Sequence, residues 1–242
     1  MKKIIDVKKL NKSFGGKEVL RDIDMSLYEN ENLVILGKSG SGKSVLIKCI
    51  VRLIDPDSGK IDILGENMMA DDTAKVNAIR RNVGFLFQGA AIYDSMSVRE
   101  NLEFPVTRAG EKKEKKEVEG LVHEALENVG LQDAINKLPS ELSGGMRKRL
   151  GLARTLILKP KIILYDEPTT GLDPVTSQEI SGLILEIQEK YKASSIIITH
   201  DMSCAKMTAN RIKMLKDAKF YAEGKYDELK KSDDEEVNSY FK

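Results

Sequence analysis

The sequence has only two cysteines, almost no net charge and no long apolar run. Cys49 and Cys204 lie far apart in segments with helical apolar spacing, so we expect buried free thiols and a reducing compartment. The formal net charge of +1 lacks the basic excess that nucleic-acid binding usually requires, so nucleic acid is not an expected partner. No segment reaches the ~18 consecutive apolar residues of a membrane span.

The amino-terminal segment, MKKIIDVKKL, contains lysines but no apolar run after them. Its alternation predicts a strand and not a signal peptide. The 242 residues suit one large α/β domain with a modest helical insertion, and neither repeats nor a low-complexity linker divide them. We therefore expect a soluble, cytoplasmic protein that serves a membrane process only through a partner.

Short apolar segments alternate with helical ones, which predicts an α/β architecture with parallel strands at the core. Strands are expected within 3–36 (ending in the apolar run 32–36) and at 60–64, 83–87, 162–165, 195–199, 212–215 and 220–222. Helices are expected at 43–53, 71–80, 146–158 and 174–190, with 89–158 mostly helical. The predicted organisation is one domain at 1–231, with a helical subdomain at about 89–158, and a tail at 232–242.

One motif matches the pattern G-x-x-x-x-G-K-[ST] in full, at Gly37-Lys38-Ser39-Gly40-Ser41-Gly42-Lys43-Ser44. It lies between an apolar strand and a helix, so backbone N–H groups and the helix N-terminus would face phosphate oxygens. We expect Lys43 to reach the β- and γ-phosphates, Ser44 to ligate Mg²⁺, and Val45 to complete the binding loop. The predicted cofactors are ATP and Mg²⁺.

A second motif places two carboxylates after four apolar residues, at Ile162–Tyr165 followed by Asp166 and Glu167. A buried strand would carry both acids to its carboxyl end, where open α/β sheets bind their ligands. Asp166 is suited to hold the Mg²⁺ shell. Glu167 is suited to be the general base that polarises the attacking water.

A third motif is Leu142-Ser143-Gly144-Gly145 before a helix, a second helix N-terminus able to face an anion. One nucleotide needs only one P-loop. A second anion-facing turn therefore suggests a nucleotide held by another copy of the chain, although an ordinary glycine turn would give the same pattern.

Together with a later Ile-Thr-His at 198–200, these motifs resemble the ABC ATPase family over nearly the whole chain. The resemblance implies a P-loop NTPase with a RecA-like core, an N-terminal antiparallel β subdomain and an inserted α-helical subdomain. It also implies a head-to-tail dimer, in which Ser143, Gly144 and Gly145 contact the γ-phosphate of ATP bound to the opposite subunit.

Four further residues take roles from the same resemblance. Gln88 matches the glutamine that touches Mg²⁺ and senses the transport partner, and His200 matches the histidine on the γ-phosphate. Asp173 matches the loop that crosses the dimer interface. Phe14 falls where the family places an adenine-stacking aromatic, and a core phenylalanine is the alternative.

A narrower resemblance is to the Mla/Mce lipid-transport ATPases, which move phospholipid between inner and outer membranes or into plastids. It is carried by the stretch from Gln88 to Pro105, by Met146, and by segments 165–174 and 233–241. It implies a multi-pass permease docked on the partly apolar region after Gln88, an Mce-type substrate-binding protein, and a place on the cytoplasmic face of the inner membrane. Another cargo, such as amino acids or lipoproteins, and a non-transport ABC role stay open.

The tail combines a capping-box pattern with apolar residues at helical spacing. Ser232 and Glu235 form the capping pattern, and Val237, Tyr240 and Phe241 are the apolar groups. We expect the tail to dock, for example on the partner ATPase subunit, with a frayed terminus as the alternative.

Overall fold

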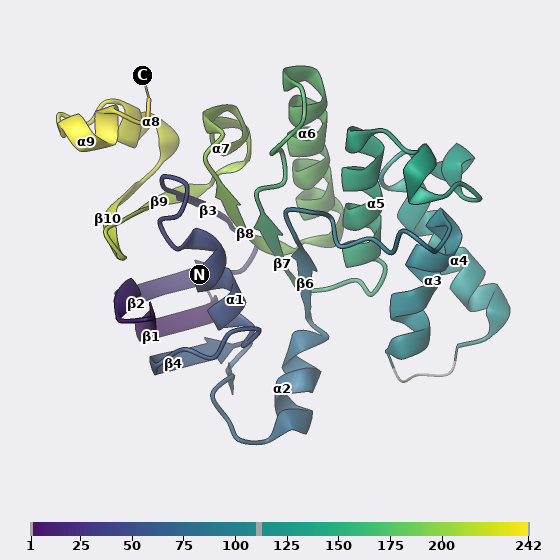
Figure 1. The fold of residues 1–242 in the computed structure, drawn as a ribbon, viewed down its shortest axis with the longest axis horizontal. Coiled ribbons are helices and arrows are strands. Elements are labelled where there is room, and N and C mark those ends of the chain that lie inside the picture. The colour runs from purple at the N-terminus through teal and green to yellow at the C-terminus, as the bar shows by residue number, and fades with distance from the viewer. Residues whose placement is uncertain (1, 110–112, 242) are drawn as a thin grey trace.

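The computed structural model describes residues 2–109 and 113–241, and these form the predicted α/β fold around two sheets (Figure 1). The central sheet has six strands in the order β10-β9-β3-β8-β7-β6. All are mutually parallel except β10, which pairs antiparallel with β9. Their bounds are β3 Asn32–Leu36, β6 Val83–Leu86, β7 Ile162–Asp166, β8 Ser194–Thr199, β9 Arg211–Lys216 and β10 Lys219–Gly224.

The second sheet is antiparallel, with the order β2-β1-β4-β5. Its strands are β1 Lys3–Phe14, β2 Lys17–Tyr28, β4 Ser58–Ile63 and β5 Glu66–Asn67. This sheet and α1 (Lys43–Ile50) pack on one face of the central sheet, and α2 (Thr73–Arg80) lies beside them (Figure 1). The N-terminal antiparallel subdomain is thus confirmed.

The opposite face of the central sheet is covered by helices. They are α5 Gly144–Leu156, α6 Pro174–Tyr191 and α7 Met202–Thr208. Helices α3 Val98–Arg108 and α4 Lys115–Glu127 pack against α5, and the 3-10 turns η1 Gln132–Ala134 and η2 Pro139–Glu141 lie between α4 and α5 in the chain. Helices α3, α4 and α5 lie together on the right of Figure 1, as expected for a helical insertion. The boundaries proposed for it, about 89–158, stay a prediction.

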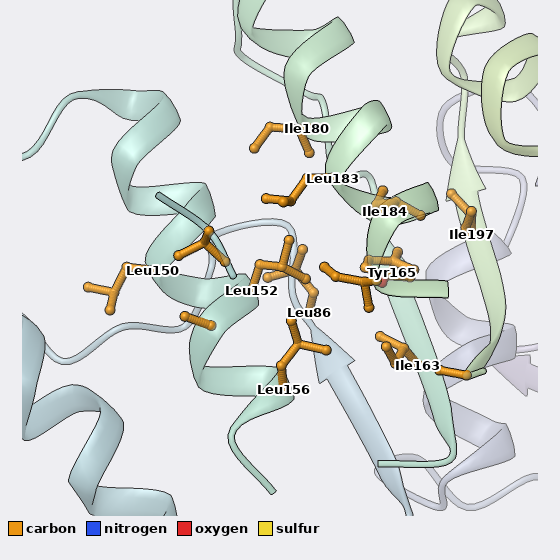
Figure 2. Close-up of a cluster of buried hydrophobic side chains, with 14 of the residues drawn as sticks. Leu86, Leu150, Leu152, Leu156, Ile163, Tyr165, Ile180, Leu183, Ile184 and Ile197 are labelled. Atoms are coloured by element: carbon orange, nitrogen blue, oxygen red, sulfur yellow. The ribbon is translucent and has the colours of Figure 1, made fainter. Parts of the chain in front are cut away.

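Each central strand sends alternate side chains to the two faces, because successive residues in a strand point in opposite directions. In β7, Ile163 and Tyr165 join the cluster under α5 and α6, whereas Ile162 and Leu164 join the cluster on the α1 side. Figure 2 shows the first cluster, where leucines of α5 and α6 meet Leu86 and Ile197 from neighbouring strands. The strand segments read as uniformly apolar because both faces are buried.

Several helix boundaries differ from the sequence predictions by one to three residues, and two of them have a clear local cause. Helix α1 ends at Ile50 and not at residue 53, because Val51 leaves helical geometry and Arg52 adopts a left-handed φ of 52°. Helix α5 begins at Gly144, two residues before the predicted start, because Ser143 caps it by accepting a hydrogen bond from the Met146 N–H.

Both cysteines are buried and free, as predicted. Burial raises the pKa of Cys49 and of Cys204 to about 11. Neither thiol is therefore a nucleophile at neutral pH. In the part of the chain that the structure describes, none of the helices has the length and apolar character needed to cross a bilayer.

The described tail residues pack on their own chain, so the frayed-terminus alternative is wrong. After α8 (Tyr226–Lys230), the short helix α9 (Glu235–Asn238) buries Val237, and the Phe241 ring packs edge-on against Tyr226 with centroids 5.3 Å apart. Glu236 forms an ion pair of 3.0 Å with Lys216 of β9. Contact of this tail with a partner subunit stays a prediction.

Candidate nucleotide-binding and hydrolysis site

The P-loop joins the buried strand β3 to α1, and two of its glycines admit no side chain. Gly42 has φ of 100°, and a Cβ there would lie 2.7 Å from the Val19 carbonyl oxygen. A Cβ on Gly37 would lie 2.7 Å from the Leu215 carbonyl oxygen. The loop therefore packs tightly against β2 and β9, which fixes the direction of its backbone N–H groups.

Lys43 is the first residue of α1 and is buried. Its Nζ donates to the carbonyl oxygens of Gly37 (2.7 Å) and Lys38 (3.2 Å) and lies 3.6 Å from Glu167 Oε1. Burial lowers the pKa of Lys43, and the carboxylates of Glu167 and Asp166 oppose that shift. A cation held at the inner edge of the loop is placed to meet phosphate oxygens.

Ser44 and Asp166 come together from distant parts of the chain, with Ser44 Oγ donating to Asp166 Oδ1 at 2.7 Å. A hydroxyl and a carboxylate are hard oxygen ligands, so the pair fits Mg²⁺. Across residues 2–109 and 113–241, no group of three or more His, Cys, Asp and Glu side chains could hold a metal ion. A Mg²⁺ ion here would take most of its ligands from water and phosphate, as Mg²⁺ usually does in phosphate-binding sites.

Glu167 directly follows β7 and is fixed from several directions. Its N–H donates to the Ile198 carbonyl (2.9 Å), and its Oε2 accepts from Thr170 Oγ1 (3.1 Å). The same Oε2 lies 2.8 Å from Nδ1 of His200. Glu167 is only 8% exposed, so its carboxylate is held in one orientation by protein groups and not by bulk water.

Most of the predicted site residues line one cleft of about 350 Å³. It is lined by Val19, Ser39, Gly40, Ser41, Gly42, Lys43, Ser44, Val45, Gln88, Glu167 and His200. The P-loop, the residues that directly follow β7 and β8, and the second residue after β6 thus converge at the carboxyl edge of the parallel strands, the expected ligand edge.

Ser143, Gly144 and Gly145 do not line this cleft. They begin α5 and adjoin the start of α6, where a Cβ on Gly145 would lie 2.6 Å from Thr176 Cγ2. Asp173 caps α6 and accepts from Thr176 Oγ1 at 2.6 Å, and this bond is the main reason why its pKa is lowered. Ser143–Gly145 and Asp173 therefore form one surface, which is separate from the P-loop cleft.

Phe14 also lies outside the lining of the cleft. It ends β1 with 48% of its surface exposed, and the Lys12 Nζ lies 5.1 Å from its ring centroid. That exposure makes the core-phenylalanine alternative wrong. Adenine stacking stays a prediction.

Three further residues at the site were not predicted from the sequence. Val19 closes against Gly42, Thr170 holds the Glu167 carboxylate, and Lys148 donates to the backbone carbonyls of Gln88 and Glu167. Lys148 left a signal, because it falls four residues before Leu152 on the buried face of its helix. A lysine on an apolar helix face requires a partner.

A strand, a glycine-rich loop and a helix N-terminus, with a serine and an aspartate placed for Mg²⁺, define a P-loop nucleotide-binding protein. Residues 20–170 match the protein family described as ABC transporter. The chain therefore belongs to the ABC transporter family.

Two relatives and one solved structure illustrate the likeness. The chain is 41% identical over 211 residues to the probable ribonucleotide transport ATP-binding protein mkl of Mycobacterium leprae, covering 87% of this chain and 60% of that relative. It is 36% identical to the glutamine transport ATP-binding protein GlnQ of Geobacillus stearothermophilus, covering 96% of this chain and 95% of GlnQ. The dimeric ATP-binding cassette MJ0796, bound to ADP and Pi, superposes with a TM-score of 0.83 at 30% identity over 92% of this chain and 98% of that one.

Proposed function

We propose that this chain is the ATP-hydrolysing subunit of an ABC transporter and that Glu167 is its general base. The observation that carries the proposal is the convergence of Lys43, Ser44 and the Glu167–His200 pair in one cleft, with Asp166 behind it, hydrogen-bonded to Ser44. When bound, Mg²⁺ would neutralise charge on the β- and γ-phosphates from the Ser44 and Asp166 side. Lys43 and the loop N–H groups hold the same phosphates.

Hydrolysis then needs a water aligned with the γ-phosphate, and Glu167 is the group placed to orient it. The contacts from Thr170 and His200 keep the carboxylate facing into the cleft. His200 is 60% exposed in its side chain, so it can also reach outward toward the γ-phosphate. Gln88 contributes the remaining wall and, by the family resemblance, a ligand to the Mg²⁺ shell.

We further propose that two copies act head to tail. The arrangement is supported by the separation within one chain between the P-loop cleft and the surface formed by Ser143–Gly145 with Asp173. The Ser143 end of α5 offers backbone N–H groups to an anion, and its own nucleotide is held elsewhere. The likeness to a dimeric cassette points the same way.

Mixing two inactive variants tests the head-to-tail dimer. Lys43→Ala disables a chain's own P-loop, and Ser143→Glu places a negative charge where the neighbour's γ-phosphate would lie. At an ATP concentration far below the raised Kd of Lys43→Ala, each variant alone is expected to be nearly inactive. An equal mixture with free exchange should recover about a quarter of the wild-type ATPase rate, because half of the dimers are mixed and each has one intact site. A mixture as inactive as its components would contradict two shared sites.

For the cargo, we propose phospholipid moved between inner and outer membranes with an Mce-type system, from the cytoplasmic face of the inner membrane. The support is the sequence resemblance after Gln88, at Met146 and in the tail. Glutamine, the cargo named for a relative that matches 96% of this chain, makes amino-acid transport the second candidate.

The docking site proposed for the permease is a groove of about 590 Å³ behind the edge strand β6. Phe85, Phe87 and Ala90 to Tyr93 form one wall, and Gly151, Arg154 and Leu158 form the other. Arg154 holds the wall by donating to the Ala91 carbonyl and by stacking over the Tyr93 ring, 4.4 Å from its centroid. The apolar lining suits a short helix of a membrane protein.

Purification of the tagged chain from native membranes in detergent tests both the proposed cargo and the proposed docking groove. We expect a multi-pass protein and an Mce-type protein to copurify, with phospholipid detected by mass spectrometry. Tyr93→Glu should abolish this copurification, while Leu53→Glu, at a residue that is also exposed (52%) but outside the groove, should not. Recovery of an amino-acid permease would support the second candidate, and loss of all membrane partners would favour a non-transport ABC protein.

A further inference from the structure

Lys148 is a buried lysine that the mechanism above does not use. It lies on α5, one turn after the Ser143 cap, and is 7% exposed. Its ammonium donates to the backbone carbonyl of Gln88 and, at 3.3 Å, to that of Glu167. Burial of an ammonium is unfavourable unless its donors are matched, and here the matches are carbonyls of two proposed site residues.

The contact with Lys148 supports an unusual backbone conformation at Glu167. Glu167 adopts a left-handed φ of 51°, a conformation that non-glycine residues rarely hold without support. The Ile198 carbonyl fixes its N–H, and Lys148 fixes its carbonyl. The two bonds restrain the peptide units on both sides of Glu167, so together they direct its side chain toward Lys43 and His200.

The same face of α5 also contacts the residues that follow Gln88. Gly151 packs against Ala90, where an added Cβ would lie 2.8 Å from the Ala90 Cβ, and Arg154 donates to the Ala91 carbonyl. Ala90 and Ala91 also have left-handed φ values, of 61° and 48°. Residues 148, 151 and 154 therefore attach α5 to the whole segment after Gln88.

We propose that Lys148 is a positioning residue for ATP hydrolysis, which sets the backbone of Glu167 and links it to the Gln88 segment. The proposal rests on the roles proposed above for Glu167 and Gln88. A displacement of the Gln88 segment by a docked partner would reach the base through the Lys148 side chain. Burial lowers the pKa of Lys148, and the nearby carboxylates of Asp166 and Glu167 oppose that shift.

Lys148→Met tests the proposal, because methionine keeps much of the chain's bulk and removes every donor. We expect kcat for ATP hydrolysis by the full chain to fall about 10- to 100-fold, since a displaced catalytic group costs that much. The Kd for a fluorescent ATP analogue should stay within about twofold, because the P-loop is untouched. Lys213→Met is the matched control: Lys213 is also buried, on β9, and pairs with Glu223. Its kcat should be unchanged.

Two further variants separate positioning from simple structural support. Lys148→Arg keeps charged donors and should recover most of the kcat lost in Lys148→Met, at a similar melting temperature. In a Glu167→Gln background, Lys148→Met should lower the single-turnover rate no further, because both changes act through one group.

A wild-type kcat for Lys148→Met, or a full additional loss in the Glu167→Gln background, would overturn the proposal. If Lys148→Met and Lys148→Arg lost kcat to the same extent, and both melted at the same lowered temperature, Lys148 would be needed for folding only. Normal hydrolysis by Glu167→Gln alone would instead refute the proposed base, which is a separate failure.

Discussion

Glu167→Gln is expected to lower the rate of ATP hydrolysis by about 10²- to 10⁴-fold while ATP still binds. The amide keeps the size of the carboxylate and can still accept the hydrogen bond from Thr170. It cannot take a proton from, or strongly polarise, an attacking water. The phosphate contacts proposed for Lys43 and the loop N–H groups would be unchanged, so we expect the proposed head-to-tail dimer to accumulate with ATP bound.

Two measurements check this result: steady-state phosphate release, and size-exclusion chromatography with and without Mg-ATP. Glu167→Gln should elute as a dimer only with ATP and should release almost no phosphate. The control is Glu179→Gln, which neutralises a half-exposed carboxylate on α6 that pairs with Arg149 of α5, and it should behave as wild type. Near-normal hydrolysis by Glu167→Gln in the assembled complex would refute Glu167 as the base.

Sequence alone could predict the position of residues whose placement depends on local order along the chain. The segment from Gly37 to Ser44 and the pair Asp166 and Glu167 each follow an apolar strand, and parallel strands bring their carboxyl ends to one edge. The 2.7 Å contact between Ser44 and Asp166 is the result of that rule. The fold class followed from the same alternation of apolar strands and helices.

The parts that sequence could not give depend on contacts between distant segments. The left-handed backbone of Glu167 is set by Ile198 and Lys148, neither of which is near it in sequence. The early end of α1 reflects a tertiary contact too, since the Arg52 guanidinium turns to donate to the carbonyls of Met68 and Ala70. Propensity cannot report such contacts, because tertiary context overrides it.

Lys43→Ala should act on binding where Glu167→Gln acts on turnover. The ammonium is the one side-chain cation of the P-loop that is buried in the cleft, and charge-assisted bonds to phosphate are among the strongest single contacts. We expect the Kd for ATP to rise about 10- to 150-fold, which corresponds to losing about 1.5–3 kcal/mol of such bonding. Lys48→Ala, on the same helix and outside the lining of the cleft, should bind normally.

The choice of nucleotide makes this prediction specific to the phosphates that Lys43 reaches. Affinity for ATP and ADP should both fall in Lys43→Ala, whereas the affinity for AMP should be nearly unchanged, because AMP lacks the β- and γ-phosphates. Titration calorimetry with the three nucleotides measures each value, and a melting curve shows that the variant is folded. An unchanged affinity for ATP would contradict the phosphate role of Lys43. An equal loss for AMP would mean that the substitution had collapsed the loop, since only a general distortion of Gly37 to Ser44 would affect a nucleotide that Lys43 does not touch.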